Sequence, residues 1–184
     1  MGVMIEDRLL LLRFKAGSGE AMRRIYGKYR GGLLKLAMGL CGDAGTAEDV
    51  VHDVFVKFAQ SADRIGVQGN LRGYLGTCVA NRVRTLMRRR RLEAAERPGV
   101  VAEPVCELSR PERWVIADEA LTKLAAAMGQ LPYEQREVVL LHIESGMTFR
   151  AISELQETSV NTVLSRYRYS IQKLRSLLNS EVEP

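Results

Sequence analysis

The sequence has few of the residues that build metal, redox and hydrolytic sites. Its 184 residues include two histidines and three cysteines. Cys41, Cys78 and Cys106 lie far apart, and no two of them have the Cys-x-x-Cys spacing of zinc or redox sites. This usage fits a reducing compartment and apolar, buried thiols better than a disulfide framework. The sequence therefore predicts no metal site and no cofactor.

The motifs of common catalytic sites are also missing. His52 and His142 fall on separate predicted helices, without a dependable set of metal ligands near either one. The sequence has no Gly-x-x-x-x-Gly-Lys-Ser/Thr, no Gly-x-Gly-x-x-Gly after a strand and no Gly-x-Ser-x-Gly. We therefore expect no intrinsic enzymatic activity and assign no catalytic residue.

Long hydrophobic runs are lacking as well. The run Leu9–Leu12 stands between Arg8 and Arg13, and it is too short for a secretion signal or a membrane span. We expect a cytoplasmic protein that does not insert into a membrane.

Aromatic residues are scarce at 6 %, whereas Leu, Ala, Met, Glu and Arg are plentiful. This composition favours helix over sheet. Apolar residues recur with helical periodicity, and no strand alternation stands out. The pattern predicts a third helix with Thr46 as its N-cap, followed by a loop at 63–70. The other predicted helices cover 5–16, 20 to about 41, 71–91, 115–128, 133–144, 148–156 and 159–178.

A break in this periodicity divides the chain. The segment 93–112 contains prolines, has no periodic pattern and is rich in acids, as is typical of an interdomain linker. The sequence therefore predicts an all-α protein in which two small helical domains, 1–92 and 113–184, are joined by an acidic linker.

Charge alternates along the chain, although the net charge is only +5. Residues 36–56 contain acids and no Lys or Arg, and residues 64–92 contain eight arginines and no acid. Acids lead again over 93–119, and they are absent over 158–180. One such block is commonly just a solvated surface. Two basic blocks, one in each half, indicate two contacts with one polyanion.

The last two predicted helices have the pattern of a helix-turn-helix, in which the second helix enters the major groove of DNA. A tight turn at 156–158 separates them, and Ser159 can cap the second helix. Its polar face suits hydrogen bonding to base edges. Two helices that simply pack together would give a similar pattern. The residues that we assign to this face are Ser159, Asn161, Thr162, Ser165 and Arg166.

Five fragments in order resemble the extracytoplasmic-function class of the sigma-70 family, the promoter-specificity subunits of bacterial RNA polymerase. They lie at 15–34, 47–57, 75–91, 131–138 and 159–166. Ala47-Glu48-Asp49-Val50-Val51-His52-Asp53-Val54-Phe55-Val56-Lys57 is very similar to the most characteristic stretch of that family.

The resemblance implies a DNA-binding transcription factor that directs core RNA polymerase to promoters and helps to open the −10 region. It implies that the acidic helix binds core polymerase through Asp49, Val50, Asp53 and Phe55. It implies that the next loop and helix bind the melted −10 element, and that the helix-turn-helix binds the duplex −35 element. It also implies an anti-sigma partner that covers these surfaces. The residues matching the −10 contacts are Ile65, Asn70, Arg72, Asn81, Arg82, Arg84 and Arg88.

The chain departs from the family pattern at a few positions. Tyr74 replaces the usual Trp, Gly73 and Gly76 lie inside an expected helix, and Glu157 stands where the turn usually has Gly. A free-standing helix-turn-helix regulator is the alternative interpretation. It explains the basic charge and the C-terminal half, but not the acidic and Arg-rich helices of the first half.

Overall fold

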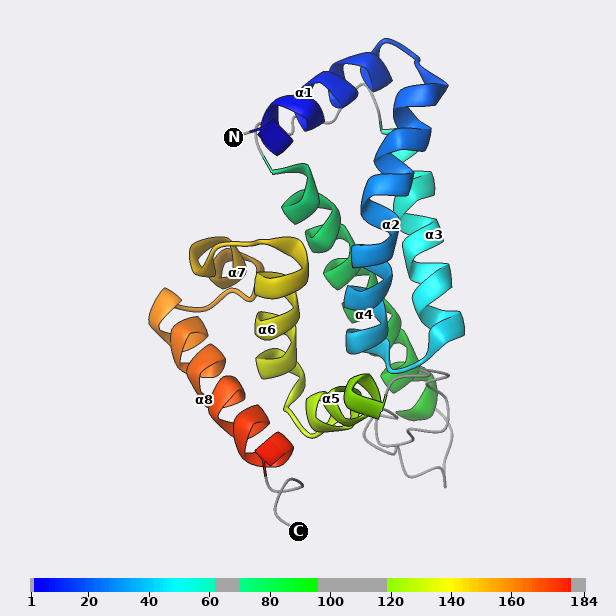
Figure 1. The fold of residues 1–184 in the computed structure, drawn as a ribbon. Coiled ribbons are helices and arrows are strands. Elements are labelled where there is room, and N and C mark those ends of the chain that lie inside the picture. The colour runs from blue at the N-terminus through cyan, green and yellow to red at the C-terminus, as the bar shows by residue number, and fades with distance from the viewer. Residues whose placement is uncertain (1, 62–69, 96–118, 180–184) are drawn as a thin grey trace.

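A computed structural model describes residues 2–61, 70–95 and 119–179, and in these ranges the chain forms eight helices and no strand (Figure 1). The all-α class predicted from the sequence is confirmed. The predicted positions 65 and 106 and most of the predicted linker lie outside the described residues. The helices are α1 (Gly2–Lys15), α2 (Gly19–Cys41), α3 (Ala44–Gln60), α4 (Leu71–Ala95), α5 (Glu119–Gly129), α6 (Tyr133–Ser145), α7 (Phe149–Leu155) and α8 (Val160–Asn179).

The helices α1–α4 form the first module, in which α2, α3 and α4 run side by side (Figure 1). Ser18 caps α2 by accepting a hydrogen bond from the amide of Ala21, and Gly42 ends it at a φ of 75°. The left-handed conformation at Gly42 is one that glycine adopts without steric cost. Apolar residues of α2 recur every three or four positions, so one face of the helix is buried against its neighbours. These include Ile25, Tyr29, Leu33, Leu36 and Leu40.

The start of α3 differs from the prediction. Asp43 is its N-cap, with Oδ2 accepting a hydrogen bond from the amide of Thr46 at 2.8 Å. Thr46, predicted as the cap, lies within the first turn, and its hydroxyl accepts a bond from Arg90 instead. Asp and Thr are both good caps, and the aspartate three residues upstream lets the helix begin earlier.

The helix α4 is longer than predicted, since it continues to Ala95, past the expected domain end at 92. Arg89 and Glu93 form an ion pair of 2.7 Å between positions one turn apart, which supports this extension. At its other end, Asn70 Oδ1 accepts a bond from the amide of Gly73 at 3.0 Å, so Asn70 caps the helix.

The helices α5–α8 form the second module and include the predicted helix-turn-helix, α7 and α8. Thr148 caps α7, and Ser159 Oγ accepts from the amide of Thr162 at 3.0 Å, which confirms Ser159 as the cap of α8. Ile152 and Val163 are fully buried between the two helices and the rest of the fold. Glu157, in the turn, has a φ of 52°, which explains why glycine would suit this position.

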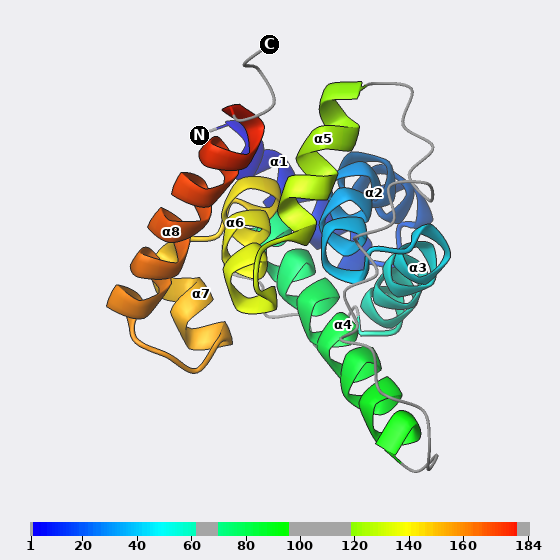
Figure 2. The ribbon, with the colours of Figure 1, turned by 90° about the horizontal axis from the view of Figure 1, so that it is seen from below.

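The two modules pack against each other. Figure 2 shows α6 lying beside α2 and α4, and one continuous hydrophobic core joins residues of both modules. Val138, Leu141, Met147, Ile152 and Val163 of the second module belong to the same core as the buried residues of α1–α4.

Replacing the cap of α3 should separate the two candidate residues. Asp43→Ala should lower the free energy of unfolding by about 1 kcal/mol, because the amide of Thr46 loses its acceptor. Thr46→Ala should cost clearly less, since this hydroxyl caps nothing. Chemical denaturation followed by circular dichroism measures both, and a larger loss for Thr46→Ala would contradict the assignment of Asp43.

Replacing Glu157 should relieve strain in the turn. Glu157→Gly should raise the free energy of unfolding by about 1 kcal/mol, because a residue with a Cβ is disfavoured at this positive φ. Glu154→Gly, in the neighbouring helix α7, should instead lower it by about 1 kcal/mol. Thermal melts of both variants check the prediction, and a Glu157→Gly variant that melts below the wild type would refute it.

Candidate functional site

The exposed side of α3 is acidic. Asp49 is exposed, and Asp53 is partly exposed, with no Lys or Arg between them on the helix. Val50 and Phe55, which we grouped with these residues from the sequence, point inward: Val50 is fully buried, and Phe55 packs against Tyr26 with ring centroids 4.7 Å apart. The two apolar side chains therefore support the acidic face from beneath, and their part in the polymerase contact stays a prediction.

Asp53 is bound to α4. Arg82 donates two hydrogen bonds to Asp53 Oδ2, from Nε at 2.9 Å and from Nη2 at 2.6 Å. Both side chains are partly exposed, so water screens the pair. The ion pair links a residue predicted for polymerase binding to one predicted for DNA binding.

A pocket of about 290 Å³ lies between α3 and α4. Asn81 and Arg82 line it together with Tyr74 and Cys78. Burial raises the pKa of Tyr74, and the neighbouring Cys78 contributes to the same shift. The phenol ring of Tyr74 therefore offers an aromatic surface and a protonated hydroxyl beside two polar side chains that the sequence assigned to the −10 contact.

The other residues predicted for the −10 contact are spread along α4. Arg72 and Arg88 are exposed. Asn70 is partly engaged, because it caps α4 and its amide also donates to the carbonyl of Gly146 at 3.4 Å. Thus α4 carries its basic and polar side chains over most of its length and does not gather them in one place.

The polar face of α8 is largely accessible. Asn161 and Ser165 are exposed, while Ser159 and Thr162 hydrogen-bond to each other at 2.8 Å. Arg166 donates to Gln156 Oε1 at 2.6 Å, so the turn of the motif holds this arginine. The five side chains lie along the N-terminal half of the second helix of the motif, the part that contacts base edges in helix-turn-helix proteins.

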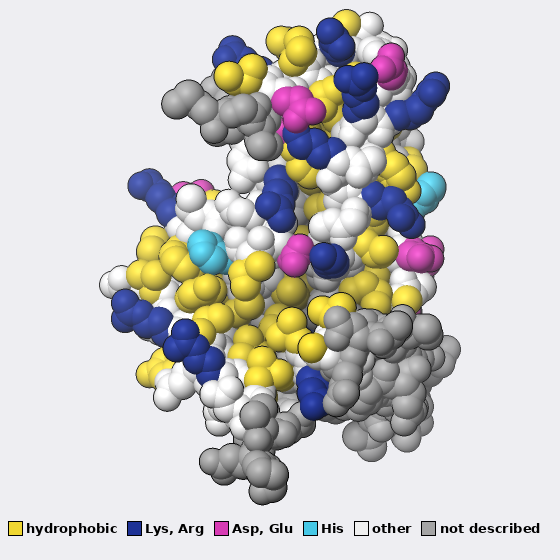
Figure 3. All heavy atoms as spheres, in the orientation of Figure 1, with side chains coloured by type: hydrophobic (Ala, Val, Ile, Leu, Met, Phe, Trp, Pro, Cys, Tyr) yellow, Lys and Arg dark blue, Asp and Glu magenta, His cyan; other side chains and the backbone are white. Residues whose placement is uncertain are grey.

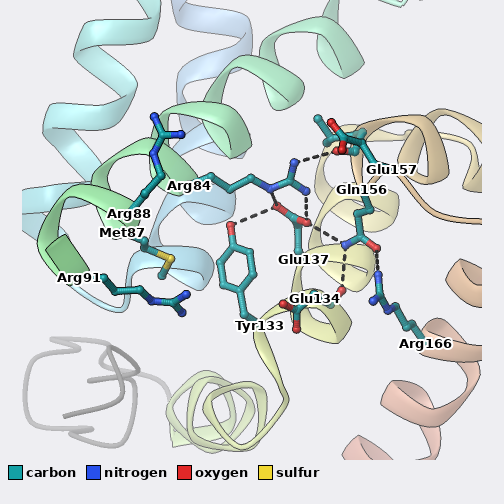
Figure 4. Close-up of a pocket in the computed structure, with 11 residues that line it drawn as sticks. Arg84, Met87, Arg88, Arg91, Tyr133, Glu134, Glu137, Gln156, Glu157 and Arg166 are labelled. Carbon is teal, nitrogen blue, oxygen red and sulfur yellow. Dashed lines mark hydrogen bonds and ion pairs between the residues drawn. The ribbon is translucent and has the colours of Figure 1, made fainter. Parts of the chain in front are cut away.

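Where the modules meet, Arg84 of α4 binds Glu137 of α6 (Figure 4). Its Nε and Nη2 donate to the two carboxylate oxygens at 3.0 and 2.5 Å, and its Nη1 donates to the carbonyl of Leu155 at 2.8 Å. Tyr133 and Gln156 also donate to the Glu137 carboxylate. The Glu137 side chain has no exposed surface, whereas Arg84 is about one-third exposed at 32 %.

The electrostatics follow from this geometry. Burial opposes the charge of Arg84, but its bonds to Glu137 outweigh that effect and raise the pKa of the guanidinium. Burial together with the negative charge of Glu137 raises the pKa of Tyr133 well above its usual value. Arg84 and Tyr133 therefore both keep their protons throughout the physiological range.

An open pocket of about 610 Å³ surrounds this network (Figure 4). Basic side chains line it from both modules: Arg84, Arg88 and Arg91 from α4, and Arg166 from α8. The sequence does not reveal this arrangement, because the residues at 84 and 137 are far apart in the chain and their attraction leaves no local pattern. The glycines at 39 and 76 were the available signal, since both adjoin the second module.

Two further observations concern the predicted absences. Within the described ranges, no three His, Cys, Asp or Glu side chains are grouped so that they could hold a metal ion. Likewise, none of the helices described here is both long and apolar enough to cross a membrane.

Burial raises the pKa of Cys41 to about 11, so this thiol stays protonated near neutral pH.

Two family profiles match this chain, one on each module. Sigma-70 region 2 matches residues 25–93, and Sigma-70, region 4 matches residues 121–174. The chain belongs to the sigma-70 family. Its region-4 profile is of the extracytoplasmic-function type, and sigma factors of this kind direct RNA polymerase to promoters. They are transcription initiation factors and not catalytic enzymes.

Relatives of this sigma factor span most of its length. It is 29 % identical over 146 residues to the sigma factor EcfG of Rhodopseudomonas palustris, covering 79 % of this chain and 78 % of EcfG. It is 26 % identical to the sigma factor CnrH of Cupriavidus metallidurans, covering 96 % of each chain.

Solved structures show the same fold. The sigma factor RpoE of Bartonella quintana, in complex with the anti-sigma factor NepR, superposes with a TM-score of 0.69 at 25 % identity over 85 % of this chain and 96 % of RpoE. CnrH in complex with the cytosolic domain of CnrY gives a TM-score of 0.65 at 24 % identity over 95 % of this chain and 98 % of CnrH, which shows the likeness in fold.

Removing Arg84 should destabilise the folded chain strongly. In Arg84→Ala the Glu137 carboxylate stays buried without its main partner, so the free energy of unfolding should fall by about 3 kcal/mol. Arg89→Ala is the matched control, because its pair with Glu93 is exposed and is worth less than about 1 kcal/mol. Equal losses of unfolding free energy for the two variants in urea denaturation would show that the buried pair stabilises the fold no more than the exposed pair does.

Proposed function

We propose that this sigma factor binds core RNA polymerase through the acidic face of α3, contacts the melted −10 element through α4 and contacts the −35 duplex through α8. In this proposal the functional units are residues 1–92 and 113–184, with 93–112 as the linker. The observation that supports it is the distribution of charged and polar surfaces on the described helices. The helix α3 has an acidic face, α4 has a basic and polar face, and α8 has a polar recognition face.

The polymerase contact is assigned to Asp49 and Asp53. Asp49 is exposed and free to meet a basic partner surface, and such complementarity speeds association and fixes orientation. Asp53 already binds Arg82, so it contributes to this contact only if that pair is exchanged or shared.

The −10 contact is assigned to the pocket between α3 and α4. Asn81 offers an amide to a base edge, Arg82 offers a cation to a phosphate, and Tyr74 offers a ring for stacking. The cavity of about 290 Å³ is of a size that an unstacked base could enter. Arg72, Arg84 and Arg88 would hold the strand on either side.

The −35 contact is assigned to α8. Asn161 and Ser165 are exposed near the start of the helix, and Arg166 could reach a guanine if it leaves Gln156. Because this role requires access to polymerase and promoter DNA, we propose that the protein acts in the cytoplasm. The proposed role requires no enzymatic activity of the protein itself.

We also propose that an anti-sigma factor silences this protein. The RpoE structure was solved with the anti-sigma factor NepR bound, and the CnrH structure was solved with the cytosolic domain of CnrY bound. Figure 3 shows hydrophobic side chains gathered over α5, α6 and the adjoining part of α2. Three large apolar residues of α5 and α6 are exposed, namely Leu121, Leu124 and Ile143. A partner with an apolar face could cover them.

Run-off transcription with purified core polymerase and genomic fragments tests the promoter role. We expect specific transcripts that require this protein and that fall at least tenfold with Asp49→Arg, because a positive charge would repel a basic docking surface. Glu20→Arg makes the same charge change on α2 and should leave transcription unchanged.

Matched arginine variants test the −35 contact. Arg166→Ala should weaken promoter binding by about 1–3 kcal/mol in a sequence-dependent manner, whereas Arg175→Ala removes the same charge with little effect on specificity. If core polymerase gives no transcript with the protein, and the protein alone shifts duplex DNA in a salt-sensitive way, it is a free-standing regulator instead.

A further inference from the structure

The pocket of about 610 Å³ between α4 and the second module has the size of a small-molecule site. Part of its wall is fixed by the Glu137 carboxylate, which is fully buried. This carboxylate accepts hydrogen bonds from Arg84, Tyr133 and Gln156, and Arg84 also donates to the carbonyl of Leu155. A wall held by such a network needs little reordering when a ligand enters, which favours binding.

One side of the pocket is basic and rich in unused hydrogen-bond donors. Arg84, Arg88 and Arg91 follow one another at intervals of about one turn on α4, a spacing at which like charges repel. In the part of the chain that the structure describes, neither Arg88 nor Arg91 bonds to a protein acceptor. Arg166 donates one hydrogen bond, to Gln156, out of the five N–H groups that a guanidinium carries. Phosphate oxygens are the acceptors that suit these guanidinium groups best.

The pocket also contains two exposed carboxylates, Glu134 of α6 and Glu157 of the turn. Figure 4 shows them on one side of the Tyr133 ring, with Arg88 and Arg91 on the other. Within the described ranges, no ion pair joins either acid to these arginines. A carboxylate only accepts hydrogen bonds, so a ligand group that faces these acids must carry donors such as hydroxyl or amino groups. Inorganic phosphate meets the basic side but not the acidic one.

An apolar surface lies between the two charged sides. Tyr133, Met87 and Leu155 form it, and the hydroxyl of Tyr133 is held by Glu137 at 3.1 Å, which fixes the direction of the ring. Aromatic rings stack on planar bases, and thioethers make favourable contacts with aromatic groups. The pocket therefore combines sites for phosphates, for a flat aromatic group and for hydrogen-bond donors.

We propose that this pocket binds a free nucleoside triphosphate. The phosphates lie on Arg88 and Arg91, the base lies against Tyr133, and hydroxyl or amino groups of the nucleoside donate to Glu134 and Glu157. A nucleotide of a DNA strand offers the same chemistry, but the volume of the pocket suits one small molecule better than a chain of nucleotides. Because the proposed function assigns Arg88 to promoter DNA, a bound nucleotide would compete with DNA for it. That consequence rests on the proposed function, whereas the binding itself does not.

Isothermal titration of the full chain with ATP and with GTP, in buffer without divalent cations, tests the site. We expect saturable binding of one ligand per chain. Arg91→Ala should weaken it at least about tenfold, because a charge-assisted contact with phosphate is lost. Arg89→Ala removes the same charge from the same helix outside the pocket, and should weaken binding less than about twofold because an exposed charge is screened. No saturable binding of either nucleotide up to about 1 mM would overturn the proposal.

A change of one carboxylate distinguishes a nucleoside site from a general anion site. Glu134→Gln should weaken the binding of ATP several-fold, because a carboxylate is the stronger acceptor for hydroxyl and amino groups. The same variant should bind tripolyphosphate more tightly, because a repelling charge is gone. Glu154→Gln makes the same change outside the pocket, at a residue paired with Arg150, and should alter neither affinity. If Glu134→Gln strengthens the binding of both ligands, the nucleoside assignment is wrong.

A short oligothymidylate distinguishes a free nucleotide from a nucleotide of a strand. Unlabelled ATP should displace a fluorescent ATP analogue from the full chain at a lower concentration than the oligonucleotide does, counted per nucleotide. If only the oligonucleotide binds, and both Arg91→Ala and Glu134→Gln weaken it, the pocket takes a nucleotide of a strand and the proposal fails. These titrations use neither polymerase nor promoter, so a chain that binds ATP without supporting transcription would refute the proposed function alone.

Discussion

The arrangement of this sigma factor depends on how closely α6 approaches α2 and α4. That approach is possible because Gly39 and Gly76 leave room for Leu140 and Ser145. At the same contact, the guanidinium of Arg84 neutralises the charge of the fully buried Glu137. Packed interiors do not deform continuously, so the loss of this fit would not give a slightly looser version of the same contact. We therefore expect the modules to be either docked or separate.

The same arginines serve two tasks that compete. Arg82 holds Asp53 and Arg84 holds Glu137, yet both lie on the helix that we assign to the −10 strand. Phosphate groups are strong, bidentate partners for arginine and could replace a carboxylate. Arg82 can exchange partners at little cost, because its ion pair is partly exposed. Arg84 cannot, because release would leave the Glu137 carboxylate uncompensated unless α6 moves away and water reaches it.

Local signals explain what the sequence predicted well. Helical periodicity and the cap at Ser159 depend on residues that are close together in the sequence, so the helix-turn-helix could be located before its structure was known. The cap of α3 was misplaced because Asp43 and Thr46 are both competent. Val50 and Phe55 were grouped with the acidic face because a motif match shows which positions correspond, but not where their side chains point. The partners of Arg84 and Gly76 lie in the other module, and nothing near them in sequence indicates what they touch.

The glycines at 39 and 76 gain a meaning only where the two modules touch. Gly73 and Gly76 are both poor helix formers, and both depart from the residue pattern of the family. The close approach that they allow lets Val138, Leu141 and Met147 of the second module share the core of the first, so separating the modules would expose a hydrophobic interface.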